Sequence, residues 1–451
     1  MTADVMKKTA EGVAEWLRGD GAGPVVARGA AEAFVVNMVG AGLALICNVL
    51  LARMLGADEY GFYIYALGWM LILAFGGKFG LESSSIRYVA AYHANREWGL
   101  LRGYLGWSLR TAAVTSVSIA LVGFGIVALL GGHVTEKEVH FYLVTFLLLP
   151  FTVLLLIRSA ALQGFKKVVM AQAPSSVLLP VVIVGGVFAN WLAHDGQVGA
   201  VEAMTVHLGA TIISFLVVFY FVRVNQPPEV VNTAPEYCKG EWIKTAFSLL
   251  AISGFFVVIQ QTDIIIVGLF HGATHSGIYA AANKVASFVA SGLMVVNIIV
   301  APTISQLHTT GDTYELKRVL RMAAIFSFVI AIPVAVSVFL FGGWILELFG
   351  PRFSEAYVAL LILTLGQMVN ALAGAVGLFM TMTGNEKVMA RIAGCCATLN
   401  VMFNFMLIPP FGIEGAAAST ACTVVLWNVG LAVYIYRRFG IHVSVLSLVG
   451  K

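Results

Sequence analysis

The stretch Gly56–Tyr63 (GADEYGFY) lies between two long apolar runs of the chain. Its pattern returns 216 residues later at Gly272–Tyr279 (GATHSGIY), again between two apolar runs. A shorter pair, Gly196–Ala200 and Gly412–Ala416, keeps the same offset and the same order. Because the pairs recur in order at one offset, chance repetition of short glycine-containing loops is a poor explanation. The sequence therefore predicts two similar halves.

The composition indicates a membrane protein. Of the 451 residues, 59% are apolar and 11% are charged, and the mean hydropathy is +0.90. A soluble domain needs more charge on its surface, whereas apolar runs of about 20 residues are long enough to cross a bilayer as helices. We therefore predict an all-α integral membrane protein. The net charge of +4 does not indicate a nucleic-acid partner, because the cations are concentrated in the loops on one side.

The apolar runs predict about twelve transmembrane helices. Six crossings in each half return the chain to the same side, so we expect two parallel six-helix pseudo-repeats with a cavity between them. In transporters, cargo is held at an interface of this kind. The expected spans are 29–54, 60–86, 105–130, 140–162, 169–193 and 199–222 in the first half, and 245–270, 276–304, 319–346, 354–382, 388–409 and 414–437 in the second.

Lysine and arginine are unevenly distributed over the loops. If the N-terminus is cytoplasmic, the external segments carry only Arg53, Lys137 and Arg352, and every cytoplasmic segment is richer in these residues. This asymmetry favours a multi-pass protein with both termini in the cytoplasm. The predicted domains are a cytoplasmic N-terminal segment 1–27, a first six-helix lobe 28–222, a cytoplasmic linker 223–244, a second six-helix lobe 245–437 and a cytoplasmic tail 438–451.

Several kinds of chemistry leave no pattern in this sequence. There is no G-x-x-x-x-G-K-[ST] loop for ATP and no H-E-x-x-H or other metal-ligand spacing. The five cysteines include no C-x-x-C pair, and most lie in apolar runs. The external loops are too short to carry the polar active site of a membrane polymerase or glycosyltransferase. We therefore expect no enzyme activity, no catalytic residue, no metal and no cofactor.

Asp263 and Lys284 are ionisable residues inside predicted spans, where a charge costs about 2.5–3.5 kcal/mol on insertion. Each lies about ten residues from the turn at Ala273, so antiparallel helices would place them at similar depth. A salt bridge between them is feasible. It would either lock the two helices together or leave one partner facing the cavity as a cargo contact or switch. Gln260, one turn from Asp263, shares its face.

A second group of charges lies on the second span. Lys78 and Glu82 are four residues apart and share a helix face. They would either form an ion pair near the cytoplasmic interface or, for the deeper Lys78, face the cavity. Arg53 lies near the external end of the first span, where snorkelling is the simplest interpretation.

Four segments resemble the oligosaccharide flippases that carry O-antigen and related polysaccharide units. They are Leu50–Tyr63, Phe79–Tyr88, Asp263–Gly268 with Gly277–Lys284, and Pro409–Ala417. Occurring in order, they are similar to the polysaccharide transporter family of the multidrug/oligosaccharidyl-lipid/polysaccharide exporter superfamily, and the resemblance covers residues 28–437.

The resemblance implies a V-shaped pair of six-helix lobes that moves a polyprenyl (di)phosphate-linked oligosaccharide across the bacterial cytoplasmic (inner) membrane by alternating access. This role belongs to cell-surface polysaccharide biosynthesis, such as that of lipopolysaccharide. Its partners would be the lipid-linked substrate and the bilayer, with a polysaccharide polymerase and chain-length proteins as candidates. A diphosphate headgroup needs a hydrated, cationic cavity, because burying an unpaired charge is prohibitive.

Our hypothesis is that Lys78, Lys284 and Arg53 bind the headgroup. Asp263, Glu82 and Gln260 would set the charge of these cations or gate the cavity. The nearest alternative is a cation-coupled multidrug exporter of the same superfamily. A membrane polysaccharide polymerase is an alternative of a different class.

Overall fold

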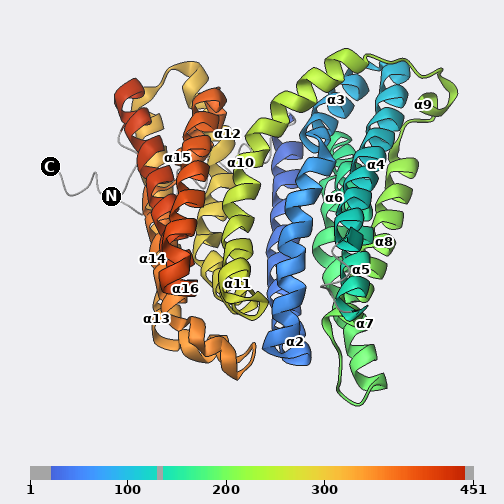
Figure 1. The fold of residues 1–451 in the computed structure, drawn as a ribbon. Coiled ribbons are helices and arrows are strands. Elements are labelled where there is room, and N and C mark those ends of the chain that lie inside the picture. Colours follow the sequence, from blue (N-terminus) through green and yellow to red (C-terminus); the bar gives the residue numbers. More distant parts are fainter. Residues whose placement is uncertain (1–21, 130–135, 442–451) are drawn as a thin grey trace.

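The computed structural model describes residues 22–129 and 136–441, and Figure 1 shows this part as a bundle of helices. Most of the predicted N-terminal segment and of the predicted tail lies outside the described residues. Two helices are much longer than the roughly 20 residues that one crossing requires. These are α2 (Ala22–Lys78) and α16 (Glu386–Phe439).

Each long helix is divided by one glycine. The backbone of α2 bends at Gly56, with φ 74° and ψ 169°, and that of α16 bends at Gly412, with φ 57° and ψ −133°. Glycine adopts positive φ without the steric penalty that a Cβ brings. Both helices therefore turn back and cross twice, at the boundaries that the sequence predicts between the first two and the last two spans.

Nine helices of the described residues are long and apolar enough to cross a membrane, and a shorter apolar stretch at Val257–His271 adds another. Because α2 and α16 each consist of two helices, the predicted all-α fold with about twelve crossings is confirmed. In the first half the other helices are α4 (Trp98–Leu129), α5 (Glu136–Gly164), α6 (Val168–Ala173) continued by η1 (Pro174–Leu178) and α7 (Leu179–Ala193), and α8 (Ala200–Asn225). In the second half they are α10 (Lys239–His271), α11 (Ala273–Ser287) continued by η2 (Phe288–Ala290) and α12 (Ser291–Thr310), α13 (Thr313–Glu347), and η3 (Pro351–Ala356) with α14 (Tyr357–Ala373) and α15 (Val376–Met382).

The second span ends earlier than its hydropathy predicts. The expected range 60–86 is broken after Lys78, where Phe79 (φ 47°) and Gly80 (φ 70°) both adopt left-handed backbone angles. A separate helix, α3 (Leu81–Asn95), follows and lies at the upper end of the bundle (Figure 1). A similar break at Gly374 (φ 71°) separates α14 from α15 within the expected span 354–382. Hydropathy does not report such breaks, because apolar residues continue on both sides of them.

The segment predicted as a linker, 223–244, is partly helical and packs on the first half. It contains α9 (Pro228–Asn232) and the first residues of α10. Trp242 of α10 is fully buried, and its Nε1 donates to Tyr92 Oη of α3 at 2.8 Å. Figure 1 shows α10 passing from above α3 towards the second half, where it packs against α16. α10 therefore joins the two halves, and the exact domain boundaries remain predictions.

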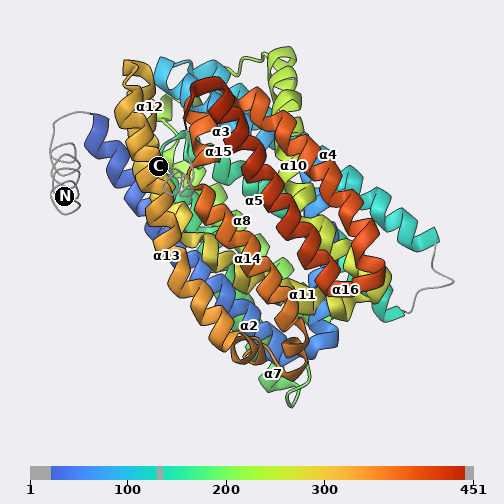
Figure 2. The same cartoon turned by 90° about the vertical axis from the view of Figure 1, so that its left-hand side faces the viewer.

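The two halves meet along the second crossing of α2, which packs against α10 and α11. Gly61 and Gly277 face each other there, and a Cβ on Gly61 would collide with the backbone of Ala273 and Thr274. Small residues let membrane helices approach closely. In Figure 2 the second half faces the viewer, with α13, α14 and α16 in front of α2. We call the end of the bundle that carries the turns at Gly56 and Gly272 the Gly56 end. The opposite end, which carries α3 and α9, is the linker end.

Candidate functional site

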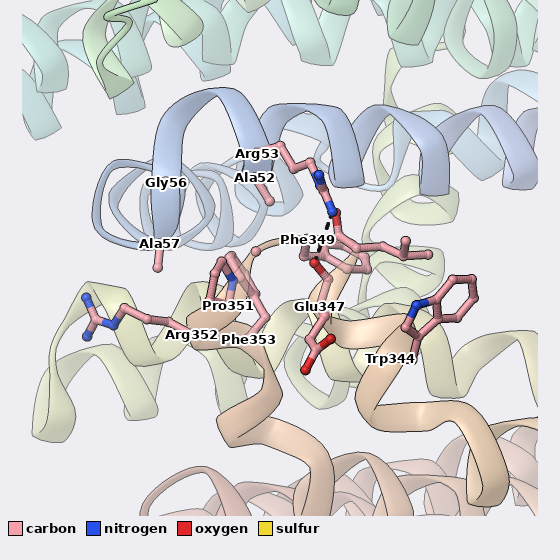
Figure 3. A pocket seen from close by; sticks show the side chains of 12 residues that line it. Ala52, Arg53, Gly56, Ala57, Trp344, Glu347, Phe349, Pro351, Arg352 and Phe353 are labelled. Atoms are coloured by element: carbon pink, nitrogen blue, oxygen red, sulfur yellow. Dashed lines mark hydrogen bonds between the residues drawn. The ribbon is translucent and has the colours of Figure 1, made fainter.

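Arg53 joins the two halves at the Gly56 end. Its Nε donates to the carbonyl oxygen of Leu348 at 2.6 Å, and its Nη2 donates to that of Glu347 at 3.3 Å. These carbonyls lie at the C-terminal end of α13, where the helix dipole favours a positive charge. Figure 3 shows the Arg53 side chain reaching from α2 to this end of α13. Arg53 therefore connects the two halves through hydrogen bonds, which the snorkelling interpretation did not include.

Asp58 makes the second set of contacts at this end. Its Oδ1 accepts hydrogen bonds from Arg352 Nη1 at 2.9 Å and from Thr274 Oγ1 at 2.8 Å. Asp58 and Thr274 occupy the same position in the two repeated stretches, so the sequence repeat contacts its own copy. The repeat alone could have suggested this pairing, whereas the role of Arg352 needs the structure. We call Arg53, Asp58, Thr274 and Arg352, with the end of α13, the Gly56-end closure.

A cavity of about 750 Å³ lies at the closure. Arg53 and Gly56 line it from the first half, and Trp344, Glu347 and Arg352 line it from the second. Figure 3 shows these side chains around it, with Arg352 pointing away from Arg53. The two arginines are therefore held by separate partners, and the cavity is bounded by residues that must separate if the halves part at this end.

Lys284 lies at the interface between the halves. It is on α11, is partly exposed, and comes within electrostatic reach of Cys47 on the first crossing of α2. The ion pairs found among the described residues do not include Lys284. It is twelve residues beyond Gly272, which places it about 18 Å along the helix from the Gly56 end. A cation at this depth needs an anion or water, because hydrocarbon does not solvate it.

Lys78 is placed differently from Lys284. Its Nζ bonds Glu82 Oε2 at 2.8 Å, and 19% of the Lys78 side chain is exposed. Lys78 is the last residue of α2, about 33 Å along the helix from Gly56. The structure therefore pairs Lys78 with Glu82, but Glu82 belongs to α3 and the break at Phe79–Gly80 lies between them, so the two residues do not share one helix face as predicted. Arg53, Lys284 and Lys78 lie at three successive depths and do not form one cluster.

The predicted salt bridge between Asp263 and Lys284 is wrong. Asp263 is 2% exposed, and its carboxylate faces α11 and α16 within the second half. Its Oδ2 accepts from Tyr279 Oη at 2.8 Å and from Thr420 Oγ1, and its Oδ1 accepts from Asn404 Nδ2. Counting residues along the two helices estimates depth, but depth does not fix the direction in which a side chain points.

The surroundings of Asp263 are polar and, among the described residues, without a cationic partner. Asn404 Nδ2 also donates to Asn400 Oδ1 at 3.1 Å, and Asn400 Nδ2 reaches Thr423 Oγ1 at 3.2 Å. Asn404 Oδ1 is buried and accepts no hydrogen bond. A buried carboxylate among neutral groups requires either a proton or a small cation to compensate its charge. The sequence pointed to Asp263, but not to its partners Tyr279 and Thr420.

Other site predictions have a simpler outcome. Gln260 is exposed and is not part of the hydrogen bonds around Asp263. Within residues 22–129 and 136–441, no three or more His, Cys, Asp or Glu side chains gather in a way that could hold a metal ion.

The fold and the contacts between its halves define a multi-pass membrane protein of the two-lobe transporter class. The family model for "polysaccharide biosynthesis protein" matches residues 26–308, and a second model, MatE, matches residues 246–406. The first match covers more than half of the chain. This protein belongs to the polysaccharide biosynthesis protein family.

Relatives and solved structures agree with this assignment. A Haloferax volcanii protein described as the probable low-salt glycan biosynthesis flippase Agl15 is 24% identical over 404 residues, covering 88% of this chain and 80% of its own length. The lipid II flippase MurJ in an inward closed conformation superposes with a TM-score of 0.69 at 15% identity, covering 89% of this chain and 86% of its own. An inward-facing MATE-family multidrug transporter gives 0.68 at 12% identity, with 91% and 98% covered.

Proposed function

We propose that this protein is a flippase that moves a polyprenyl (di)phosphate-linked oligosaccharide across the membrane. The observation that carries the proposal is Lys284, a cation at mid-depth between the halves that has no carboxylate partner among the described ion pairs. An anionic headgroup supplies the missing counter-charge, while its hydrocarbon chain can stay in the bilayer. Family membership and the flippase Agl15 among the relatives support the same substrate class.

The mechanism that fits this geometry is alternating access. With both termini in the cytoplasm, the Gly56 end is external, and the Gly56-end closure seals it. The headgroup then enters from the linker end, where Lys78 lies paired with Glu82, and passes to Lys284. Release requires the bonds of Arg53 and Asp58 to break. Arg53 thereby gates the passage in this state, and it becomes available to the headgroup when its carbonyl partners leave.

Asp263 has a separate role in this proposal. It lies in the core of the second half, so it does not touch the headgroup directly. Binding and release of a proton or a small cation would change the charge on the carboxylate, and Tyr279 and Thr420 connect that change to α11 and α16. Because α11 also carries Lys284, the charge state of Asp263 can bias the position of the cargo site.

A deletion strain complemented with variants tests the function. Lys284→Ala is expected to leave lipid-linked units on the cytoplasmic leaflet and to reduce surface glycan at least about tenfold, the effect of losing one charged contact. Lys78→Ala is expected to cause a smaller loss, because that lysine is already paired. Lys387→Ala is the control, since Lys387 is exposed at the start of α16. Normal export by both Lys284→Ala and Lys78→Ala would refute the site assignment.

The same strain separates the alternatives. The MatE match and the MATE-family fold keep a multidrug exporter as the second candidate. Loss of an exporter would change sensitivity to toxic cations and leave glycan intermediates unchanged. Loss of a polymerase would leave single units already exported. We further propose that the protein acts in the cytoplasmic membrane, next to the polymerase and chain-length proteins that use its product, and that it catalyses no covalent step.

A further inference from the structure

A second polar cavity lies away from the interface between the halves, at the linker end of the first half. It has a volume of about 230 Å³ and is formed by α4, α5, α8 and the segment that follows α8. Three arginines line it, Arg102, Arg158 and Arg223. None of the residues that line the cavity is acidic. The cavity shares no residue with the Gly56-end closure, the Asp263 network or Lys284.

Arg158 is the most unusual of the three arginines. Only 8% of the residue is exposed, its guanidinium carbon lies 5.4 Å from the centre of the Phe219 ring, and its Nε is buried without a hydrogen-bond partner. A snorkelling arginine would instead place its guanidinium in water. Stacking on Phe219 compensates part of the charge, but a buried guanidinium without an anion is strongly unfavourable.

Arg102 and Arg223 complete a positive surface around Arg158. Nη1 of Arg102 donates to the carbonyl oxygens of Val231 at 2.6 Å and Thr233 at 2.7 Å, which holds the segment after α8 beside the cavity. Arg223 is exposed in the last turn of α8. Guanidinium groups match the oxygens of a phosphate with paired hydrogen bonds.

The position and size of the cavity narrow the ligand further. Arg158 is six residues from the end of α5 at Gly164, or about 9 Å along the helix, close to the boundary between hydrocarbon and headgroups. The cavity is large enough for a phosphate group with several waters. Basic pockets between helices on the cytoplasmic side of membrane proteins bind anionic lipid headgroups.

We propose that Arg158, Arg223 and Arg102 form a binding site for a phosphate-bearing anion, separate from the transport pathway. The phosphate belongs either to the headgroup of a membrane phospholipid or to a soluble phosphate. Bound there, it neutralises Arg158 and joins α5, α8 and the segment leading to α9. Because that segment continues into α10, which reaches the second half, occupancy stabilises the arrangement of helices at the linker end.

The test uses the full chain purified in mild detergent, with the variants Arg158→Met and Arg223→Met. Native mass spectrometry measures binding of cardiolipin, phosphatidylglycerol and phosphatidylcholine. Thermal unfolding in sodium phosphate, compared with sodium chloride at equal ionic strength, measures binding of free phosphate. Arg438→Met is the control, because Arg438 is exposed at the end of α16 in the other half. Arg223→Met changes an exposed side chain and should fold, so its binding of lipid and phosphate tests the proposal if Arg158→Met does not fold.

A lipid site predicts that cardiolipin and phosphatidylglycerol bind and phosphatidylcholine does not, with binding about tenfold weaker in Arg158→Met and also reduced in Arg223→Met. A free-phosphate site predicts a phosphate-dependent rise in the unfolding temperature that both variants lose. Either result supports the proposal and identifies the source of the phosphate. The proposal is overturned if Arg158→Met and Arg223→Met bind lipid and respond to phosphate to the same extent as wild type and Arg438→Met.

Discussion

Replacing Arg53 with alanine is expected to open the Gly56 end without unfolding either half. Arg53 contributes two hydrogen bonds across the interface, to the carbonyl oxygens of Leu348 and Glu347. Both acceptors belong to the end of one helix, so the substitution leaves the packing within each half unchanged. The free energy lost should therefore appear in the equilibrium between closed and open states.

The structure sets the size of the effect. A hydrogen bond from a charged group contributes about 1.5–3 kcal/mol when buried, and less when water can replace it. Arg53 is exposed, so about 1.4 kcal/mol for the two bonds together is a reasonable value, which corresponds to a tenfold change in the equilibrium constant. If the open state makes up about 1% of the wild type, the variant should populate it to about 10%.

Electron–electron double resonance between spin labels on the two halves measures this shift. Gln197→Cys and Glu414→Cys place labels at exposed positions of the Gly56 end, one in each half, with the exposed native cysteines Cys238, Cys395 and Cys422 replaced by serine. Arg53→Ala should add a longer distance to the distribution.

Arg352→Ala is the matched comparison for Arg53→Ala. The ion pair of Arg352 with Asp58 joins side chains that are 50% and 74% exposed, and pairs of this kind contribute about 0–1 kcal/mol. We expect at most about a fivefold shift from its loss. An unchanged distance distribution in Arg53→Ala, or a larger change in Arg352→Ala than in Arg53→Ala, would refute this account of the closure.

Two further predictions concern the interior of the protein. Asp263→Asn keeps the shape of the side chain, so the variant should unfold within a few degrees of wild type but should not transport. Asp263→Ala leaves donors such as Tyr279 Oη unpaired and should lower the free energy of unfolding by about 2–4 kcal/mol. Full transport by a folded Asp263→Asn variant in proteoliposomes would show that the charge of Asp263 is not needed. Gly61→Val places a side chain against the backbone of Ala273 and Thr274, so the spin-label distances at the Gly56 end should shift to the open state, and a wild-type distribution would contradict the close packing described here.

The sequence predicted the crossings of this fold well for a physical reason. Hydropathy reports how much of a segment lies in lipid, and the repeat at Gly56 and Gly272 marks turns where glycine allows the backbone to reverse. Hydropathy did not predict the end of the second span at Phe79–Gly80, because the backbone break there interrupts an apolar stretch whose composition is the same on both sides. Lys78 and Glu82 were paired correctly, but they lie on α2 and α3, on either side of this break, and not on one continuous helix face.

Contacts between distant helices were harder to predict. Counting residues along the helices predicts similar depths for Asp263 and Lys284, but Asp263 points towards α16 and bonds Asn404 and Thr420. The direction of a side chain is not visible in a sequence whose helices are apolar on every face. Arg53 was singled out as one of the few cations on its side of the membrane, and the structure gives it two carbonyl acceptors more than 290 residues away. Such a pairing depends on how the two halves dock.

The most direct test is translocation of a purified polyprenyl diphosphate-linked oligosaccharide in proteoliposomes, followed by its accessibility to an enzyme added outside. Wild-type protein should move the lipid between leaflets, and Lys284→Ala should slow that movement at least about tenfold, while Lys387→Ala proceeds at the wild-type rate. Equal rates in all three proteins, or no movement of the lipid by wild type, would contradict the claim that an anionic headgroup passes between the two halves at Lys284.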